Sequence, residues 1–181
     1  EARVLRQFSH PNVVGVIDAG ELPGEGLLFM AMELLHGSPL SNHLRPGQPM
    51  PSMEIIPVLI EVCAGLSAAH AAGVIHRDIK PENIFLAIVE GSGVVPKILD
   101  FGLSKAGDGR MQNRISASGQ VMGTPAYMSP EQALAAPMIT PAVDVWGLGV
   151  ILYEAVSGKL PFAGANAGVQ LDAIVRDAPA P

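Results

Sequence analysis

Three short segments hold the side chains best suited to chemistry in this chain. Residues 76–83 read His-Arg-Asp-Ile-Lys-Pro-Glu-Asn, Asp-Phe-Gly at 100–102 begins 17 residues after Asn83, and Ser-Pro-Glu at 129–131 closes a long stretch without helix or strand pattern. Carboxylates can accept protons, and carboxylate and amide oxygens are the ligands that a hard cation such as Mg²⁺ prefers. Each string alone is a weak signal, because Asp and Gly are common in turns. All three in order, with suitable gaps, are very unlikely by chance.

In this order the strings resemble the signature motifs of protein kinases. The resemblance covers essentially the whole chain and is greatest to bacterial eukaryotic-like serine/threonine kinases; the Lys-Pro pair at 80–81 resembles the serine/threonine branch. It implies an α+β, protein kinase-like fold, mostly the helical C-lobe with the end of the N-lobe. Residues 1–35 would be the remnant of the N-lobe and hinge, with the end of helix C and two strands. Residues 36–181 would be the C-lobe with the catalytic loop and activation segment, truncated at both ends.

The resemblance also implies the reaction, a transfer of the ATP γ-phosphate to Ser or Thr hydroxyls of protein substrates with Mg²⁺ as cofactor. Such a transfer needs mainly positioning and charge neutralisation. Asp78 would orient the attacking hydroxyl and accept its proton, and Lys80 would place a positive charge near the transferring phosphate. Asn83 and Asp100 would bind the magnesium that bridges the phosphates. Thr124, in Gly-Thr-Pro, would contact Asp78 and Lys80 and shape the substrate pocket.

The same resemblance assigns nucleotide contacts near the start of the chain. Glu1 lies ten residues before Pro11, where the helix-C glutamate that pairs with a strand lysine belongs; the alternative is a solvated acid at a helix end. Met32 matches the gatekeeper position, although a methionine there is equally well explained as core filler. Backbone groups of Glu33 and Leu35 match the hinge that binds adenine.

Two further groups of residues carry expectations from the family. Ser116 and Ser118 fall where bacterial relatives carry autophosphorylated threonines, and Arg77 could pair with a phosphate there; ordinary polar loop residues are the alternative. A stacked apolar spine that couples helix C to the metal-binding loop is matched by Leu5, Val16, His76 and Phe101.

The elements that must position these residues follow from the pattern of apolar side chains. We expect the end of a helix at 1–8, strands at 13–17 and 27–32, a helix from about 55 to 72, a hairpin at 84–88 and 97–99, a long loop at 100–131, a helix at 144–156 and another near 165–176. The 144–156 helix is apolar nearly all round, which predicts deep burial.

Individual residues sharpen this outline. Gly73 should close the first long helix as a left-handed cap, and Pro57 predicts that this helix starts late or is kinked early. Cys63 falls in its apolar pattern, which favours a buried small hydrophobe over a catalytic thiol. The family resemblance places Asp144 under the 76–77 backbone, where it would accept hydrogen bonds, and a carboxylate in so apolar a helix needs such donors.

Composition excludes several other classes of protein. Among 181 residues, 49% are hydrophobic and 15% charged, which argues against disorder. The net charge of −6 disfavours a nucleic-acid binder, and a single cysteine rules out a cysteine-rich metal site. No stretch reaches about 18 uncharged apolar residues, so we expect no membrane segment in this chain. We expect a cytoplasmic location, which is compatible with a parent protein anchored in a membrane elsewhere.

The sequence also departs from the family pattern. No glycine-rich loop and no Val-Ala-Ile-Lys-type strand precede Glu1, and the family's last helices, with the arginine that usually pairs with Glu131, do not follow. We therefore expect an internal piece of a longer protein that, alone, binds ATP weakly and transfers phosphate poorly. A catalytically dead pseudokinase scaffold is the alternative, but such a protein would lose residues like Asp78, Asn83 or Asp100. A small-molecule kinase is disfavoured by the complete Ser-Pro-Glu segment.

Overall fold

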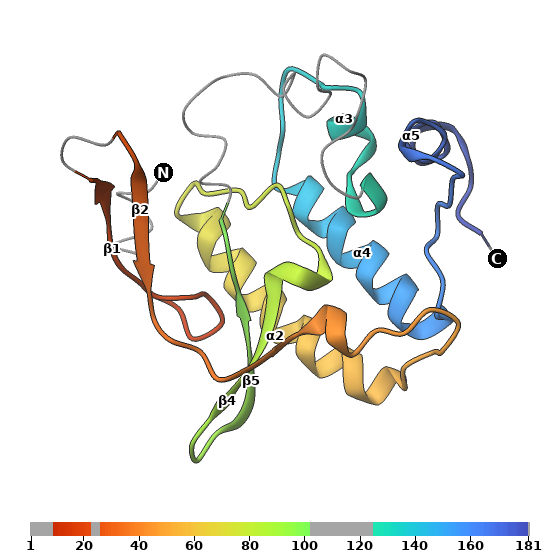
Figure 1. Cartoon of the computed structure of the whole chain (residues 1–181). Helices are drawn as coiled ribbons and strands as arrows, with labels where there is room; N and C mark the ends of the chain where they lie inside the picture. The colour runs from red at the N-terminus through yellow and green to blue at the C-terminus, as the bar shows by residue number, and fades with distance from the viewer. Residues whose placement is uncertain (1–8, 23–25, 102–124, 181) are drawn as a thin grey trace.

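The structure is a computed structural model that describes residues 9–22, 26–101 and 125–180 (Figure 1). The expectations for Glu1, Leu5, Ser116, Ser118 and Thr124 lie outside these residues. The β1–β2 hairpin lies to one side of the helices, and the chain then runs into the second sheet and the helical part (Figure 1). This mixture of small sheets and helices agrees with the predicted α+β class.

The described residues form two small antiparallel sheets. The first contains β1 (Val16–Glu21) and β2 (Leu28–Met32); the second has the order β3 (Gly37–Pro39), β4 (Ile84–Val89) and β5 (Gly93–Ile98). The first strand begins later than the predicted 13–17. Val13 and Val14 are instead buried, and the Val14 N–H donates to the Ile98 carbonyl at 3.0 Å. The predicted run therefore ties the N-terminal hairpin to β5 before it becomes a strand.

Beside the strands, the described residues form four α-helices and three short 3₁₀ turns. The helices are α2 (Ser52–Ala71), α3 (Pro130–Ala133), α4 (Ala142–Ser157) and α5 (Ala167–Arg176), and the 3₁₀ turns are Leu40–Asn42, Pro81–Asn83 and Pro125–Tyr127. Helix α2 begins at Ser52 and runs through Pro57, so the late start predicted from that proline is not found.

Helix α2 ends in the predicted glycine cap. Gly73 has φ +77°, its N–H donates to the carbonyl of His70 at 2.9 Å, and the Val74 N–H donates to the carbonyl of Ala69 at 2.9 Å. This pair of bonds is a Schellman motif, which satisfies carbonyls that the helix end would otherwise leave without partners. The motif turns the chain directly into residues 76–83.

The main core lies between α2, α4 and the second sheet. It includes Ile55, Leu59, Val62, Leu66, Ala69, Ile84, Ile98, Leu148 and Ile151. The inward residues of α2 recur every three or four positions, as one face of a helix requires.

Two burial predictions were wrong. Cys63 is exposed, because the inward face of α2 runs through Leu59, Val62 and Leu66 and Cys63 lies off that face. Helix α4 buries one face only: Val145 is 64% exposed, and Leu152 and Val156 are exposed as well.

Among the described residues, α2 alone is long and apolar enough to cross a membrane by those two measures. Core helices of globular proteins have the same profile, and the inward face of α2 belongs to the core cluster. Its Glu61 accepts a hydrogen bond from Asn12 at 2.9 Å.

Candidate active site

The loop at 76–80 is held from below by a buried carboxylate. Asp144 is fully buried on α4; its Oδ1 accepts the Arg77 N–H at 2.8 Å, and its Oδ2 accepts the His76 N–H at 2.9 Å and the ring N–H of His70 at 2.7 Å. The expectation that Asp144 lies under this backbone and accepts its hydrogen bonds is confirmed. A buried carboxylate is costly unless donors surround it, and these three supply that compensation.

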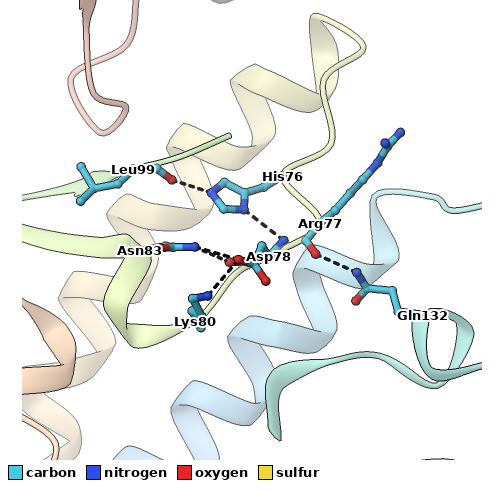
Figure 2. A network of polar contacts seen from close by, with 7 residues as sticks. All are labelled: His76, Arg77, Asp78, Lys80, Asn83, Leu99 and Gln132. Carbon is cyan, nitrogen blue, oxygen red and sulfur yellow. Dashed lines mark hydrogen bonds and ion pairs between the residues drawn. The ribbon is translucent and has the colours of Figure 1, made fainter. Parts of the chain in front are cut away.

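His76 links this loop to the end of β5 (Figure 2). Its Nε2 lies 2.7 Å from the Leu99 carbonyl, and its Nδ1 lies 3.2 Å from the Asp78 nitrogen. A carbonyl can only accept and a backbone amide can only donate, so Nε2 carries the proton and Nδ1 does not. Burial lowers the pKa of His76, which favours this neutral form. The ring also packs 4.8 Å from that of Phe101, the contact expected within the apolar spine.

Two side chains converge on Asp78 (Figure 2). The ammonium of Lys80 lies 2.9 Å from Asp78 Oδ2. The Asn83 amide nitrogen lies 2.8 Å from the Asp78 carbonyl oxygen and 3.3 Å from Oδ2. Asp78 and Lys80 are each about a third exposed at the side chain, at 29% and 32%, so the pair borders solvent while Asn83 is buried. The arrangement holds a carboxylate in one direction at the surface.

Asn83 and Asp100 lie at the same end of the β4–β5 hairpin. The Asn83 carbonyl accepts the Leu99 N–H at 2.8 Å, and Asp100 follows with φ +51°, exposed to solvent. Burial lowers the pKa of His76, and the bond to the Leu99 carbonyl and the charges of Asp144, Asp78 and Asp100 act against it.

These residues fit a magnesium site completed by a ligand. Because the Asn83 nitrogen donates to Asp78, its amide oxygen is the atom that can bind a cation, and Asp100 adds a carboxylate. The described residues contain no group of three His, Cys, Asp or Glu side chains that could hold a metal by themselves. Mg²⁺ commonly binds through one or two protein ligands plus substrate phosphates and water. The donor set suits that mode.

Comparison with known proteins decides the family. A family model described as a protein kinase domain matches residues 1–179. The chain belongs to the protein kinase family. It is 39% identical over 171 residues to the serine/threonine-protein kinase Pkn1 of Myxococcus xanthus, covering 94% of this chain and 24% of that protein. Identity to PknA of Mycobacterium tuberculosis (strain H37Rv) is 43% over 170 residues, covering 92% of this chain and 38% of PknA.

The kinase chain thus spans about a quarter to two fifths of these curated relatives. The predicted resemblance to bacterial serine/threonine kinases and the predicted kinase-like fold are confirmed.

The segment predicted to be the hinge is tied to β5 through Glu33. The Glu33 carboxylate accepts the Gly15 N–H at 2.7 Å and the Lys97 ammonium at 2.7 Å, and the Glu33 N–H donates to the Gly15 carbonyl at 2.9 Å. Burial alone would raise the pKa of Glu33, but the hydrogen bonds from Lys97 and Gly15 hold it below its usual value. The carbonyl of Glu33 is therefore the backbone group with which it could meet adenine. Met32 is 37% exposed at the end of β2, and adenine binding by Glu33 and Leu35 stays a prediction.

The segment that follows residue 124 docks on α4. The Tyr127 hydroxyl donates to Glu154 Oε2 at 2.6 Å; burial, and then this bond and the charge of Glu154, raise the pKa of Tyr127 far above its ordinary value. The phenol is therefore a constant hydrogen-bond donor. A small pocket beside it is lined by Arg77, Asp78, Ile79, Lys80, Met128 and Gln132 as well as Tyr127. This pocket lies beside Asp78 and Lys80.

Sequence reasoning missed Tyr127, Glu154 and Gln132. Ser129 and Gln132 form a capping box at α3, a signal that the Ser-x-x-Gln spacing could have given. The bond from Gln132 to the Arg77 carbonyl, at 2.7 Å, depends on folding across 55 positions and has no local signature. Glu131 is exposed, so no cost of a buried unpaired carboxylate arises there in the described structure.

Proposed function

We propose that the protein containing this chain is an ATP- and magnesium-dependent serine/threonine protein kinase. The observation that carries the proposal is the convergence of Lys80 and Asn83 on Asp78, beside a pocket bordered by Tyr127 and Gln132. A carboxylate held in this way can orient an alcohol and take its proton.

In the proposed reaction, the Asp78 carboxylate accepts the proton of a Ser or Thr hydroxyl while the oxygen of that hydroxyl bonds to the γ-phosphorus. The bond from that phosphorus to the β–γ bridging oxygen breaks, and ADP leaves. Lys80, 2.9 Å from Asp78, supplies positive charge next to the transferring group. Asn83 and Asp100 would hold the magnesium, which when bound neutralises charge on the phosphates. Lys80, Asn83 and Asp100 are thus also the proposed nucleotide contacts from this part of the chain.

Asp78→Asn in the full-length protein tests this proposal. The substitution keeps the size of the side chain and removes its basicity, so phosphate transfer to a generic protein substrate should fall by about 10²- to 10⁴-fold. ATP binding, followed by a fluorescent nucleotide with and without Mg²⁺, should be retained. The pseudokinase scaffold would be favoured instead if the wild-type protein binds Mg-ATP but shows no phosphate transfer above that of Asp78→Asn.

We propose further that the 181 residues alone transfer phosphate weakly, because the sequence contains neither a Gly-x-Gly-x-x-Gly loop nor a Val-Ala-Ile-Lys-type strand. Full-enzyme rates from the purified chain would contradict this.

Ser116 and Ser118 are the proposed sites of autophosphorylation. Arg77 precedes Asp78, and its side chain extends away from the Asp78 carboxylate (Figure 2). This direction is compatible with the proposed pairing of Arg77 with a phosphate on one of these serines. Mass spectrometry of the active full-length protein that finds both serines unmodified would refute these sites.

A further inference from the structure

The peptide unit that joins Arg77 to Asp78 is held at both of its polar atoms. Its carbonyl accepts the side-chain amide of Gln132 at 2.7 Å, and its N–H, on Asp78, donates to His76 Nδ1 at 3.2 Å (Figure 2). Arg77 has φ +67°, a conformation that a residue with a Cβ keeps only where its surroundings impose it. The direction of the Asp78 side chain therefore depends on these anchors.

Gln132 lies on a different element from the other residues that hold this loop. His76 and Asp144 belong to the loop itself and to the helix beneath it, whereas Gln132 lies on α3, just after the segment that borders the substrate pocket. Its side chain is almost fully buried, with 7% of the residue exposed. A buried amide at this point links the position of α3 to the backbone next to Asp78.

The two ends of the Gln132 side chain make separate contacts. The oxygen accepts the Ser129 N–H at 3.2 Å, while the nitrogen donates to the Arg77 carbonyl. The oxygen therefore completes the capping box of α3, and the nitrogen holds the catalytic loop. A substitution that changes one end alone can distinguish the two contributions.

We propose that Gln132 is a positioning residue for Asp78, which holds the 77–78 peptide so that the carboxylate faces the acceptor hydroxyl. The proposal rests on the kinase function proposed above. In this arrangement α3 must be docked before Asp78 is correctly directed, so the same bond couples the substrate-binding segment to the chemical step. The shared pocket of Asp78, Lys80 and Gln132 places the three groups around one space.

Gln132→Glu in the full-length kinase separates the roles. Glutamate retains the oxygen that caps Ser129 and is itself favoured in a capping box, but its carboxylate repels the Arg77 carbonyl instead of donating to it. We expect kcat to fall by about 10- to 100-fold, since small misplacements of catalytic groups have such effects. The KM for ATP should change by less than about twofold. As pH falls from 8 to 5.5, the ratio of the variant's kcat to that of the wild type should rise, because a protonated carboxyl can donate again.

Gln170→Glu is the matched control. Gln170 is also buried, at 9% exposed, and its Nε2 donates to a backbone carbonyl, that of Phe162, at 3.0 Å on α5. Both variants introduce the same charge and remove the same kind of bond. A fall in kcat for Gln132→Glu with little change for Gln170→Glu supports the proposal. Equal falls in the two variants, or a wild-type kcat and a flat pH ratio in Gln132→Glu, overturn it.

If Gln132→Glu does not fold, Gln132→Met replaces it. Methionine fills a similar volume and lacks both polar ends, and the same fall in kcat is expected. A second measurement keeps this test apart from the proposed function. If the wild type transfers no phosphate, the kinase proposal fails, and amide hydrogen exchange at Asp78 then decides the positioning role. Exchange at least about tenfold faster in Gln132→Glu than in Gln170→Glu supports it, and equal rates refute it.

Discussion

The amide nitrogen of Asn83 contacts Asp78 twice, at 2.8 Å from its carbonyl oxygen and 3.3 Å from its carboxylate. A residue proposed to bind the metal therefore also fixes the residue proposed to accept the proton. The two functions share one side chain, with the nitrogen turned to Asp78 and the oxygen left for the cation.

Asn83→Asp should separate these functions. Aspartate keeps an oxygen ligand for Mg²⁺ but cannot donate to Asp78, and it brings a second negative charge to within hydrogen-bond distance of the first. We expect kcat to fall by about 10- to 100-fold while the Mg²⁺ concentration for half-maximal activity changes by less than about threefold. Steady-state kinetics with a magnesium titration measure both quantities. Wild-type kcat in this variant would show that the Asn83 nitrogen is dispensable.

Asp144→Asn should destabilise the protein. Asparagine has one acceptor oxygen, so its NH₂ group must face a donor, either the Arg77 N–H or the N–H groups of His76 and His70. Loss of a buried carboxylate that three donors surround should lower the free energy of unfolding by about 3 kcal/mol. Urea denaturation of the variant and the wild type measures this difference in the free energy of unfolding.

Asp172→Asn provides the control for that variant. Asp172 pairs with Arg176 at 2.7 Å, four residues apart on α5, and its side chain is 64% exposed. Its loss should change the free energy of unfolding by less than about 1 kcal/mol. Equal effects of the two substitutions would contradict the role assigned to Asp144.

The neutral His76 predicts a pH dependence of stability. Burial lowers its pKa in the folded state below the ordinary value of 6.5, so the unfolded chain binds the proton more readily. Stability should therefore be complete above pH 6.5 and should decrease as the pH falls below it, by at most about 1.4 kcal/mol per pH unit from this group.

His76→Gln supplies the comparison, because its amide can still donate to the Leu99 carbonyl but does not titrate. Urea denaturation between pH 5 and 7.5 should show a shallower loss of stability in the variant than in the wild type. Parallel profiles would mean that His76 does not contribute to the acid sensitivity.

Tyr127→Phe should weaken the docking of the segment around Tyr127, which is proposed to bind the substrate, on α4. The lost bond ends on a carboxylate, so about 1.5 kcal/mol of stability should be lost, and the KM for a peptide substrate should rise more than the KM for ATP. Tyr153→Phe, which loses a bond to the Ala180 carbonyl at 2.5 Å, is the control and should leave the peptide KM unchanged. An equal rise in both KM values for Tyr127→Phe would contradict a specific role at the substrate pocket.

The resemblance of the motifs and local spacing were together sufficient to predict much of this arrangement. Gly73 could be identified as a cap from its position after an amphipathic run. The resemblance to kinases marked Asp78 and Asn83 and placed Asp144 under the loop, and the cost of burying a carboxylate agreed with that placement. Of these inferences, only the glycine cap follows from the chain near the residue alone.

Other features depend on contacts that no local pattern contains. Val62 and Cys63 are both apolar, and only packing on β5 and α4 decides which one faces the core. The positive φ of Arg77 is imposed by partners 55 and 67 residues away, Gln132 and Asp144. The bond from Tyr127 to Glu154 likewise requires two segments that meet only after folding.

The imidazole of His76 joins the Leu99 carbonyl to the Asp78 N–H. Leu99 directly precedes Asp100, so the ring connects the backbone next to one acidic residue with the backbone of another. A rigid five-membered ring thus acts as a spacer of constant length. A shift of the end of β5 would therefore reach the loop at 76–80 through this ring.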